Sequence, residues 1–431
     1  MDFPASPPED EPISVVPFPR LKDEALCGVP GKIVRAVEPC TEAHPAAVLA
    51  QYLARFGCAV GRTAHIRADN REHHARVNVL VVGRTSVGAK GTSDGVVSAL
   101  FAGASRMPSE GKILWRVSDQ TPLRRVAGLS SGEGLIEIIR DASGDDPNAK
   151  NYDPGVDDKR LLVVESEFTS TLSVMERQGS NLPRILREAW DGDDLSTLTR
   201  APLRASSPHV TVVGHCTPGE LRIRLREAQL TGGTMNRFIP IASRRTKLLP
   251  DGGNIPAEVI AEYGPTIGET LVKAAKLGQV VRTDDATAMW NTRYAELRKA
   301  RPDGPVASML ARAAPQVLRI SLAYALADGS SVIADDHLGA AFALWDYAES
   351  TAEWMFGAHV DSAEVENLVQ YISGAAKTGR SRAEISSEHF KRNKPAVDIE
   401  AMLGELLRDG RIRQETDRSG PGRPTTRYLP C

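Results

Sequence analysis

Apolar residues along the chain fall into short unbroken runs that alternate with longer stretches of helical spacing. The three clearest runs lie at 77–82, 160–168 and 209–215, with the sequences VNVLVV, RLLVVESEF and HVTVVGH. Unbroken apolar runs of this length are typical of strands that are buried on both faces of a parallel sheet. Strands that alternate with helices along the chain predict an α/β fold.

Several segments have the spacing of amphipathic helices. Helices are expected at 45–59, 94–104, 182–190 and 220–230, and a helical bundle is expected from 256–301, 307–327 and 335–356. The runs at 63–67 and 77–82 flank a polar segment, which predicts a hairpin that feeds the core strand. Its two histidines, His73 and His74, are expected to be solvated rather than metal ligands, because no partner stands at ligand spacing.

The stretch 77–93, VNVLVVGRTSVGAKGTS, has the order strand, glycine loop, helix. This order holds a phosphate chain against the start of a helix, where unpaired backbone N–H groups and the helix dipole favour anions. Comparison with the pattern G-x-x-x-x-G-K-[ST] makes the loop a candidate ATP site in which the lysine binds phosphate and a hydroxyl binds Mg²⁺. The candidate residues are Gly83, Gly88, Lys90, Gly91 and Thr92.

The match to this pattern is imperfect. Ala89 separates the second glycine from Lys90, and Gly91 stands where the Mg²⁺-binding hydroxyl should be, so that Thr92 follows one place late. The alternative is an ordinary strand-to-helix turn with a solvated lysine.

Acidic residues follow the second apolar run. In a parallel α/β sheet, ligands lie at the carboxyl ends of the strands. Alternation along an extended strand places Glu165 and Glu167 on one face, so that both can approach one Mg²⁺ or orient a water. The alternative is a pair of solvated acids. Glu133, which follows two serines, is either a helix cap or a carboxylate that faces the γ-phosphate, and the cap is favoured.

Two later residues are candidates for sensing or stabilising the phosphates. His215 ends the third run, where a polar side chain can sense the γ-phosphate; a hydrogen-bonded structural histidine is the alternative. Arg237 follows a glycine-rich loop and can reach the nucleotide of a neighbouring subunit; a surface arginine bonded to carbonyls is the alternative. Arg312 and Arg319, in the predicted bundle, either reach back to the phosphates or are surface charges.

Residues 362–431 have the pattern of a separate small domain. Helices are expected at 364–374, 381–390 and 395–408, followed by strands at 411–415 and 425–429, which predicts a winged helix. The third helix is acidic, so any DNA contact should come through phosphates and the basic hairpin, with low sequence specificity. The hairpin arginines are Arg411, Arg413, Arg418, Arg423 and Arg427. A protein-binding winged helix is the alternative.

Composition limits the remaining possibilities. With 431 residues, 41% of them hydrophobic, the chain is long enough for two or three domains. The net charge of −2 means that nucleic-acid contacts must come from local patches. The five cysteines lack C-x-x-C spacing, which predicts a reducing compartment without a disulfide frame or zinc site. Nothing resembles a signal peptide or membrane span, so we expect a cytoplasmic protein without membrane contacts.

A set of motifs, taken in order, resembles one family. They are GKIVRAVEP, VGRTSVGAKGTS, GLSSGEGLI, DKRLLVVESEF, VVGHCTPGEL, NRF and RRTKLLPDGG, and they span roughly 24–357. The family is the phosphate-loop ATPase domain of primase–helicase-type replication proteins of actinobacteria, their phages and integrative elements, often classed as a domain of unknown function. The segments RAAPQVLRISLAYAL and DDHLGAAFALWDYAEST also resemble the lid bundle of ring ATPases such as the minichromosome-maintenance helicases.

The resemblance implies a ring-forming ATPase with a RecA-like or AAA+-like core. It makes Gly83, Gly88, Lys90 and Thr92 the phosphate loop, and it makes the two strand-end glutamates the acidic site. His215 becomes the sensor and Arg237 the arginine finger. The chain departs from the family at Ala89 and Gly91, at Glu165 where aspartate is usual, and in having no primase domain before the core.

Together these features predict a proline-rich arm at 1–22, an NTPase core at 23–250, a helical lid at 251–360 and a winged helix at 361–431. The expected function is an ATP-binding and ATP-hydrolysing helicase-like motor or DNA loader in the replication of a mobile element or phage, with ATP, Mg²⁺, DNA, further replication proteins and other copies of the chain as partners. The alternative is a non-enzymatic DNA-binding replication or regulatory factor with a degenerate phosphate loop. A small-molecule phosphotransferase is a third possibility, but it would give the bundle and the tail no role.

Overall fold

The computed structural model describes residues 16–84, 88–106, 108–109, 112–113, 123–144, 146–198, 202–225, 232–356, 362–375, 378–408, 411–417 and 425–430. The chain divides into two compact units. One is Pro19–Ala352, and the other is Glu353–Cys431 together with the segment that ends at Phe18. The segments expected to form the core and the lid bundle both lie in the first unit as far as Ala352.

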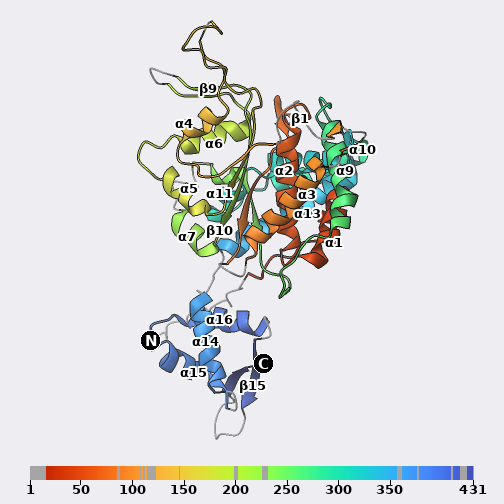
Figure 1. The fold of residues 1–431 in the computed structure, drawn as a ribbon. Helices are drawn as coiled ribbons and strands as arrows, with labels where there is room; N and C mark the ends of the chain where they lie inside the picture. The colour runs from red at the N-terminus through yellow and green to blue at the C-terminus, as the bar shows by residue number, and fades with distance from the viewer. Residues whose placement is uncertain are drawn as a thin grey trace. The chain divides into compact units, whose positions relative to one another are not determined.

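A five-stranded parallel sheet forms the centre of the first unit (Figure 1), in the order β11-β3-β10-β7-β6. All residues of β3, β7, β10 and β11 are buried, as expected for strands covered on both faces. The α/β prediction is therefore confirmed, and the three apolar runs form the three middle strands. The strands are β3 (Asn78–Val82), β6 (Arg125–Val126), β7 (Arg160–Glu165), β10 (His209–Cys216) and β11 (Phe238–Ala242).

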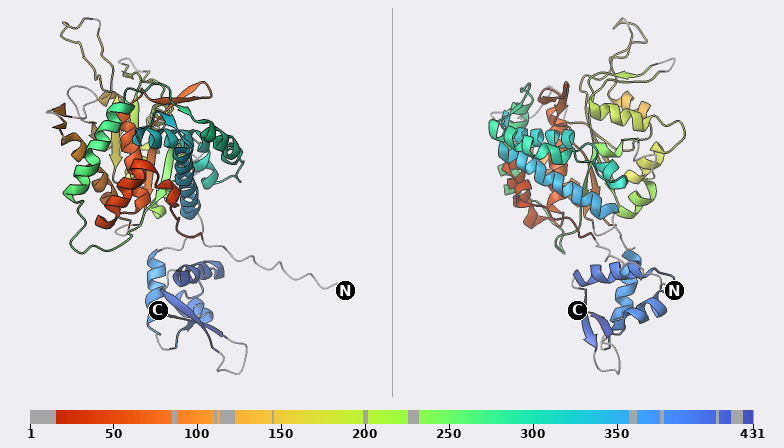
Figure 2. Two further views of the ribbon diagram at one scale, coloured as in Figure 1. Left: turned by 90° about the vertical axis from the view of Figure 1, so that its right-hand side faces the viewer. Right: turned by 180° about the vertical axis from the view of Figure 1, so that it is seen from behind.

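Helices cover both faces of this sheet (Figure 1). One face carries α2 (Pro45–Val60), α3 (Lys90–Arg106) and α9 (Ala257–Ala274), and α3 and α9 lie side by side (Figure 2). The other face carries α4 (Gly132–Ile138), α5 (Phe168–Met175), α6 (Leu182–Asp191) and α7 (Pro218–Arg224). The neighbouring strands β3 and β10 thus lead into α3 and α7 on opposite faces, and α/β sheets bind ligands at the carboxyl ends of strands related in this way.

The rest of the first unit packs around this core. The helix α12 (Ala313–Ala327) is buried along almost its whole length against α2 and α9. The other helices are α1 (Gly28–Val37), α10 (Asp284–Leu297), α11 (Pro305–Leu310) and α13 (Asp335–Phe356), with 3₁₀ turns η1 (Asp23–Ala25), η2 (Glu38–Cys40) and η3 (Met235–Arg237). Short strand pairs are β4 (Pro108–Ser109) with β5 (Lys112–Ile113), β8 (Leu195–Ser196) with β9 (Arg204–Ala205), and β12 (Val281–Arg282) with β13 (Val332–Ile333). No described helix is both long and apolar enough to cross a bilayer.

The hairpin before the core strand differs from the prediction. The strand β1 (His65–Ala68) pairs with β2 (Arg71–His74) and not with β3. Asp69 and Asn70 form the two-residue turn with φ of 51° and 59°, a left-handed conformation that these two residue types tolerate. The segment expected to be a polar turn is therefore largely strand. His73 and His74 are buried, which corrects the expectation that they are solvated.

The second unit contains the three expected helical segments and the expected hairpin. These are α14 (Ser362–Ser373), α15 (Arg382–Glu384) continued by the π-helical turn η4 (Ile385–His389), α16 (Ala396–Arg408), β15 (Ile412–Asp417) and β16 (Thr425–Pro430). An additional short strand, β14 (Arg380–Ser381), pairs with β16, so that the antiparallel sheet has the order β14-β16-β15.

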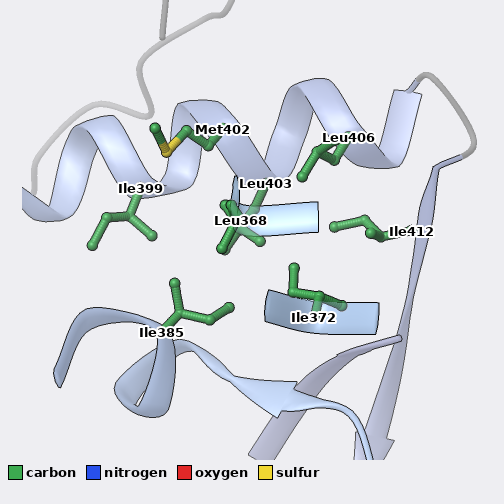
Figure 3. Close-up of a cluster of buried hydrophobic side chains, with 8 residues drawn as sticks. All are labelled: Leu368, Ile372, Ile385, Ile399, Met402, Leu403, Leu406 and Ile412. Carbon is green, nitrogen blue, oxygen red and sulfur yellow. The ribbon is translucent and has the colours of Figure 1, made fainter. Parts of the chain in front are cut away.

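This unit has its own hydrophobic core (Figure 3). The helix α16 contributes apolar side chains at helical spacing, which form one face of the helix. They meet side chains from α14, from the π-helical turn and from β15. The core residues are Leu368, Ile372, Ile385, Ile399, Met402, Leu403, Leu406 and Ile412.

Candidate functional site

The loop between β3 and α3 closes tightly at the carboxyl edge of the sheet. The Gly83 N–H donates to the Cys216 carbonyl at 3.1 Å, and the Gly88 N–H donates to the Arg84 carbonyl at 2.8 Å. A Cβ on Gly83 would lie 2.5 Å from the Ser243 carbonyl oxygen, and a Cβ on Gly88 would lie 2.8 Å from the Arg84 carbonyl oxygen. Both positions therefore require glycine for close backbone approach.

Lys90 is the first residue of α3 and bridges two strand ends. Its Nζ donates to the carbonyls of Gly83 at 2.6 Å and Cys216 at 3.1 Å, at the ends of β3 and β10. Burial lowers its pKa from the ordinary value. Ala89, the extra residue in the motif, adopts a left-handed φ of 44°, so the insertion is absorbed in one residue and the lysine still begins the helix. Gly91 and Thr92 follow on the exposed side of the first turn.

His215 lies at the end of β10 in a chain of buried polar side chains. Its Nε2 lies 3.2 Å from Oε1 of Gln51 on α2, and Gln51 Nε2 donates to Ser93 Oγ at 2.6 Å. Ser93 Oγ in turn donates to the Lys90 carbonyl at 2.7 Å. Because an amide oxygen only accepts, this network assigns the hydrogen to Nε2 and leaves Nδ1 as the acceptor.

Burial, more than the surrounding charges, keeps the His215 imidazole neutral at pH 7. Burial lowers its pKa to about 4, a direction that Lys90 and Arg125 reinforce and Asp94 opposes. Asp94 on α3 accepts from Arg125 on β6 at 2.7 Å, so these two charges compensate each other. The site therefore combines a neutral histidine with a lysine whose charge has no carboxylate contact in the described part of the chain.

Glu165 ends β7, one strand beyond His215. Its Oε1 accepts from the N–H groups of Gly128 at 2.7 Å and Leu129 at 2.8 Å, which ties the β6–α4 loop to the sheet edge. Within the described residues, its Oε2 has no hydrogen bond or ion pair. Glu167 is exposed in the turn before α5. Because the strand ends at Glu165, the expectation that alternation places both carboxylates on one strand face is wrong.

Arg237 is not presented to solvent as expected. It is buried, its Nη2 forms an ion pair with Asp191 Oδ2 at 2.6 Å, and its Nη1 donates to the Gly233 carbonyl at 2.6 Å. It also precedes β11, which begins beside Asn78 at the amino end of β3. The arginine therefore lies at the edge of the sheet opposite Lys90, one strand length of about 16 Å away. Arg319, one of the two bundle arginines, is buried near it.

The arginines expected to bind DNA differ in how accessible they are. Arg411 and Arg413 are exposed, and Arg413 forms a 3.3 Å ion pair with Glu415. Arg427 instead points inward, with its Nη1 3.3 Å from the Gly379 carbonyl and 3.4 Å from Glu384 Oε2. Arg418 and Arg423 lie outside the described residues.

A group with metal-ligand chemistry lies on the β1–β2 hairpin. His65, Glu72 and His74 place their ligand atoms within 4.8 Å of one another. The guanidinium groups of Arg62 and Arg76 lie close enough to lower the pKa of His74 further, after burial, to about 2. Two fixed cations beside the group disfavour a divalent ion there.

Two parts of this site were missed in the sequence. Gln51 is a buried amide on a helix whose neighbouring residues are mostly apolar, and a polar residue amid the apolar part of PAAVLAQYLARFG is the signal that points to it. The Arg125–Asp94 pair joins residues 31 positions apart and has no sequence signal. The helix start expected at α4 is present, but its cap is Ser131, whose hydroxyl accepts from the Gly134 N–H. The interpretation of Glu133 as the cap is wrong, since Glu133 lies in the first turn and accepts from Asn181 Nδ2 at 2.6 Å.

The comparisons with known protein families and with curated proteins found no match.

Proposed function

We propose that the first unit binds ATP with Mg²⁺ at the carboxyl ends of β3 and β10. The observation that carries the proposal is the position of Lys90 in the first turn of α3, where its Nζ contacts the carboxyl ends of β3 and β10. The helices that follow these two strands lie on opposite faces of the sheet. A helix N-terminus at such strand ends favours phosphate through its unpaired N–H groups and its dipole. The order β11-β3-β10-β7-β6, with one strand between the loop strand and the glutamate strand, suits the phosphate-loop ATPase core that the motifs resemble.

Each residue of the proposed site has a separate role in binding the phosphates and Mg²⁺. Lys90 exchanges its two carbonyl partners for phosphate oxygens, and the backbone from Gly88 to Gly91 surrounds the phosphates. Thr92 and the free Oε2 of Glu165 are the Mg²⁺ donors, and the ion supplies positive charge to the phosphates when bound. His215 reports the phosphate state to α2 through Gln51.

Hydrolysis would serve a helicase-like or DNA-loading motor in the replication of a mobile element or phage. The motif resemblance supports this proposal, and so does the second unit, whose three helical segments and hairpin fit a winged helix. Its accessible basic residues are Arg411 and Arg413 on the hairpin side and Lys391 and Arg392 in the turn before α16. Contacts of these residues with phosphates would give DNA affinity without sequence specificity.

An ATPase assay of the full chain, with and without single-stranded DNA, tests this function. We expect hydrolysis that DNA stimulates, that Lys90→Ala abolishes, and that Lys276→Ala leaves unchanged, since Lys276 is exposed and remote in sequence from the loop. Light scattering with and without ATP should show nucleotide-dependent assembly into rings. Full-rate hydrolysis by Lys90→Ala would refute the assignment.

A second candidate is a DNA-binding factor that binds nucleotide without hydrolysing it. The observation in its favour is that the backbone already engages both Lys90 Nζ and Glu165 Oε1. It predicts ATP binding and DNA binding in the same chain with no phosphate release. Loss of DNA affinity in Arg411→Gln/Arg413→Gln, unaffected by Lys90→Ala, would favour this candidate over the motor.

A further inference from the structure

We propose that the amino edge of the sheet holds a second anion site, which takes a small phosphate-bearing ligand. The site is a cavity of about 530 Å³ at the opposite end of the strands from Lys90. That volume lies within the range of small-molecule sites. Its walls come from the β1–β2 hairpin, the end of α6, the turn η3 and the segment from α10 to α12.

Four arginines line this cavity: Arg71, Arg298, Arg312 and Arg319. Two of them have a carboxylate partner, because Arg312 Nη1 lies 3.6 Å from Asp191 Oδ1 and Arg298 Nη2 lies 3.8 Å from Asp69 Oδ2. The other two have none in the described part of the chain. The cavity therefore presents guanidinium groups that its own acids, including Glu72, do not neutralise one for one.

The strongest support for an anion site comes from buried guanidinium groups in and beside the cavity wall. Arg319 is 1% exposed, its carbon Cζ lies 3.5 Å from the centroid of the Trp190 ring, and its Nη1 donates to the Trp190 carbonyl at 2.8 Å. Arg76, which is 0% exposed, donates to the same carbonyl at 3.1 Å. Two guanidinium groups thus share a backbone acceptor, and neither contacts a carboxylate of a described residue. Buried charge of this kind is costly without a counter-charge, and an anion in the cavity would supply one.

A buried histidine also lines the cavity. The lining residue His73 is 8% exposed, and neither of its ring nitrogens has a hydrogen-bond partner within the described residues. Burial and the Arg319 guanidinium lower its pKa to about 4, so at pH 7 it offers one neutral N–H donor. Arg71 is exposed at the cavity mouth and makes no ion pair or hydrogen bond with any described residue. Arg71 is therefore available to a ligand without breaking an existing bond with a described residue.

The donor set identifies the class of ligand. Guanidinium groups match the oxygens of phosphate in a planar fork, and donors that converge from the hairpin and from α12 need an acceptor with oxygens in several directions. A phosphate group meets this need better than a single carboxylate does. The shared chemistry is the phosphate group, whether it belongs to a free nucleotide-sized compound or to a nucleic-acid strand, and the size of the cavity favours the free compound.

Calorimetric titration of pyrophosphate into the full chain tests the site. The titration is run on the Lys90→Ala variant, so that phosphate binding at the carboxyl edge does not contribute. We expect one bound pyrophosphate, with affinity at least about tenfold lower when Arg71→Gln is added, which is the effect of losing one hydrogen bond to a charged group. The matched control is Arg67→Gln, an exposed arginine of the same hairpin that does not line the cavity and should leave the affinity within about twofold.

Three results would overturn the proposal. One is the absence of pyrophosphate binding at millimolar concentration in the Lys90→Ala chain. Another is an equal effect of Arg71→Gln and Arg67→Gln. The third is that Arg71→Gln weakens binding of a short single-stranded oligonucleotide but not of pyrophosphate, which would assign the cavity to a nucleic-acid strand. Arg71 is exposed, so its substitution keeps the test independent of folding, which replacement of Arg319 would not.

Discussion

Polar residues at the two edges of the central sheet differ in whether their hydrogen-bonding groups have partners. At the carboxyl edge, Lys90, Glu165 and His215 each have hydrogen-bond partners from neighbouring strands and loops. At the amino edge, among the residues that the structure describes, Arg319 has no carboxylate contact and the ring nitrogens of His73 have no hydrogen-bond partner. A polar group at the carboxyl edge must therefore give up an existing hydrogen bond to bind a ligand. At the amino edge, a ligand would add hydrogen bonds to groups that have free donors within the described part of the chain.

The amino edge depends most on Asp191, which pairs with Arg237 at 2.6 Å and Arg312 at 3.6 Å. Asp191→Asn leaves these arginines and Arg319 beside one another without a buried anion. Removing one partner of a buried pair costs about 3–5 kcal/mol, and we expect a loss of that size in calorimetric unfolding. Asp193→Asn, an exposed neighbour, is the control. Equal stability of the two variants would mean that the charges at this edge are already compensated.

The pH dependence of stability probes the same edge. Burial holds the pKa of His73 at about 4 in the folded state, below the ordinary 6.5, so the unfolded chain binds the extra proton first as pH falls. Its contribution is therefore complete above pH 6.5 and is lost between pH 6.5 and 4, by about 3 kcal/mol. Denaturant titrations of the native chain and of His73→Asn should show a shallower pH slope in the variant. Parallel slopes would place the proton elsewhere.

The hydrogen bonds from His215 through Gln51 to Ser93 provide a test at the carboxyl edge. Gln51→Leu removes the shared partner of His215 and Ser93, so that His215 Nε2 loses its hydrogen bond and Ser93 Oγ keeps only its bond to the Lys90 carbonyl. We expect a loss of about 1–3 kcal/mol and a weaker response of the protein to ATP. Gln51→Glu, which keeps the acceptor for His215 but not the donor for Ser93, separates the two bonds. No loss in either variant would show that the chain of hydrogen bonds does not stabilise this edge.

The smallest effect on stability is expected from Glu165→Gln. The amide oxygen still accepts from Gly128 and Leu129, so stability should fall by only about 1 kcal/mol. ATP hydrolysis should be lost, because the amide is a poor Mg²⁺ ligand and cannot take a proton. Glu167→Gln is the matched control, with unchanged stability. Equal ATPase activity of the two variants would remove Glu165 from the proposed machinery.

The sequence predicted well what depends on local pattern. The runs that became β3, β7 and β10 are mostly apolar and wholly buried, and Ser131 stands where a helix cap must stand. The second unit followed from the spacing of the apolar residues in α16 and the turn between β15 and β16.

The rest depended on contacts that local pattern does not contain. His73 and His74 have polar neighbours in sequence, but the hairpin folds under α12, and packing rather than composition buries them. Arg237 follows a glycine-rich loop typical of exposed segments, yet its partner Asp191 is 46 residues away. In the sequence, the extra residue Ala89 interrupts the phosphate-loop motif. In the structure, it adopts a left-handed φ, so that Lys90 still begins α3.

Equilibrium binding of a non-hydrolysable ATP analogue, with Mg²⁺, tests the central claim most directly. The native chain and the Lys276→Ala control should bind one analogue per chain with equal affinity, and Lys90→Ala should bind at least about a hundredfold more weakly, since it loses a charge with several phosphate contacts. Undiminished binding by Lys90→Ala, or no binding by the native chain, would contradict the claim that the carboxyl ends of β3 and β10 form a nucleotide site.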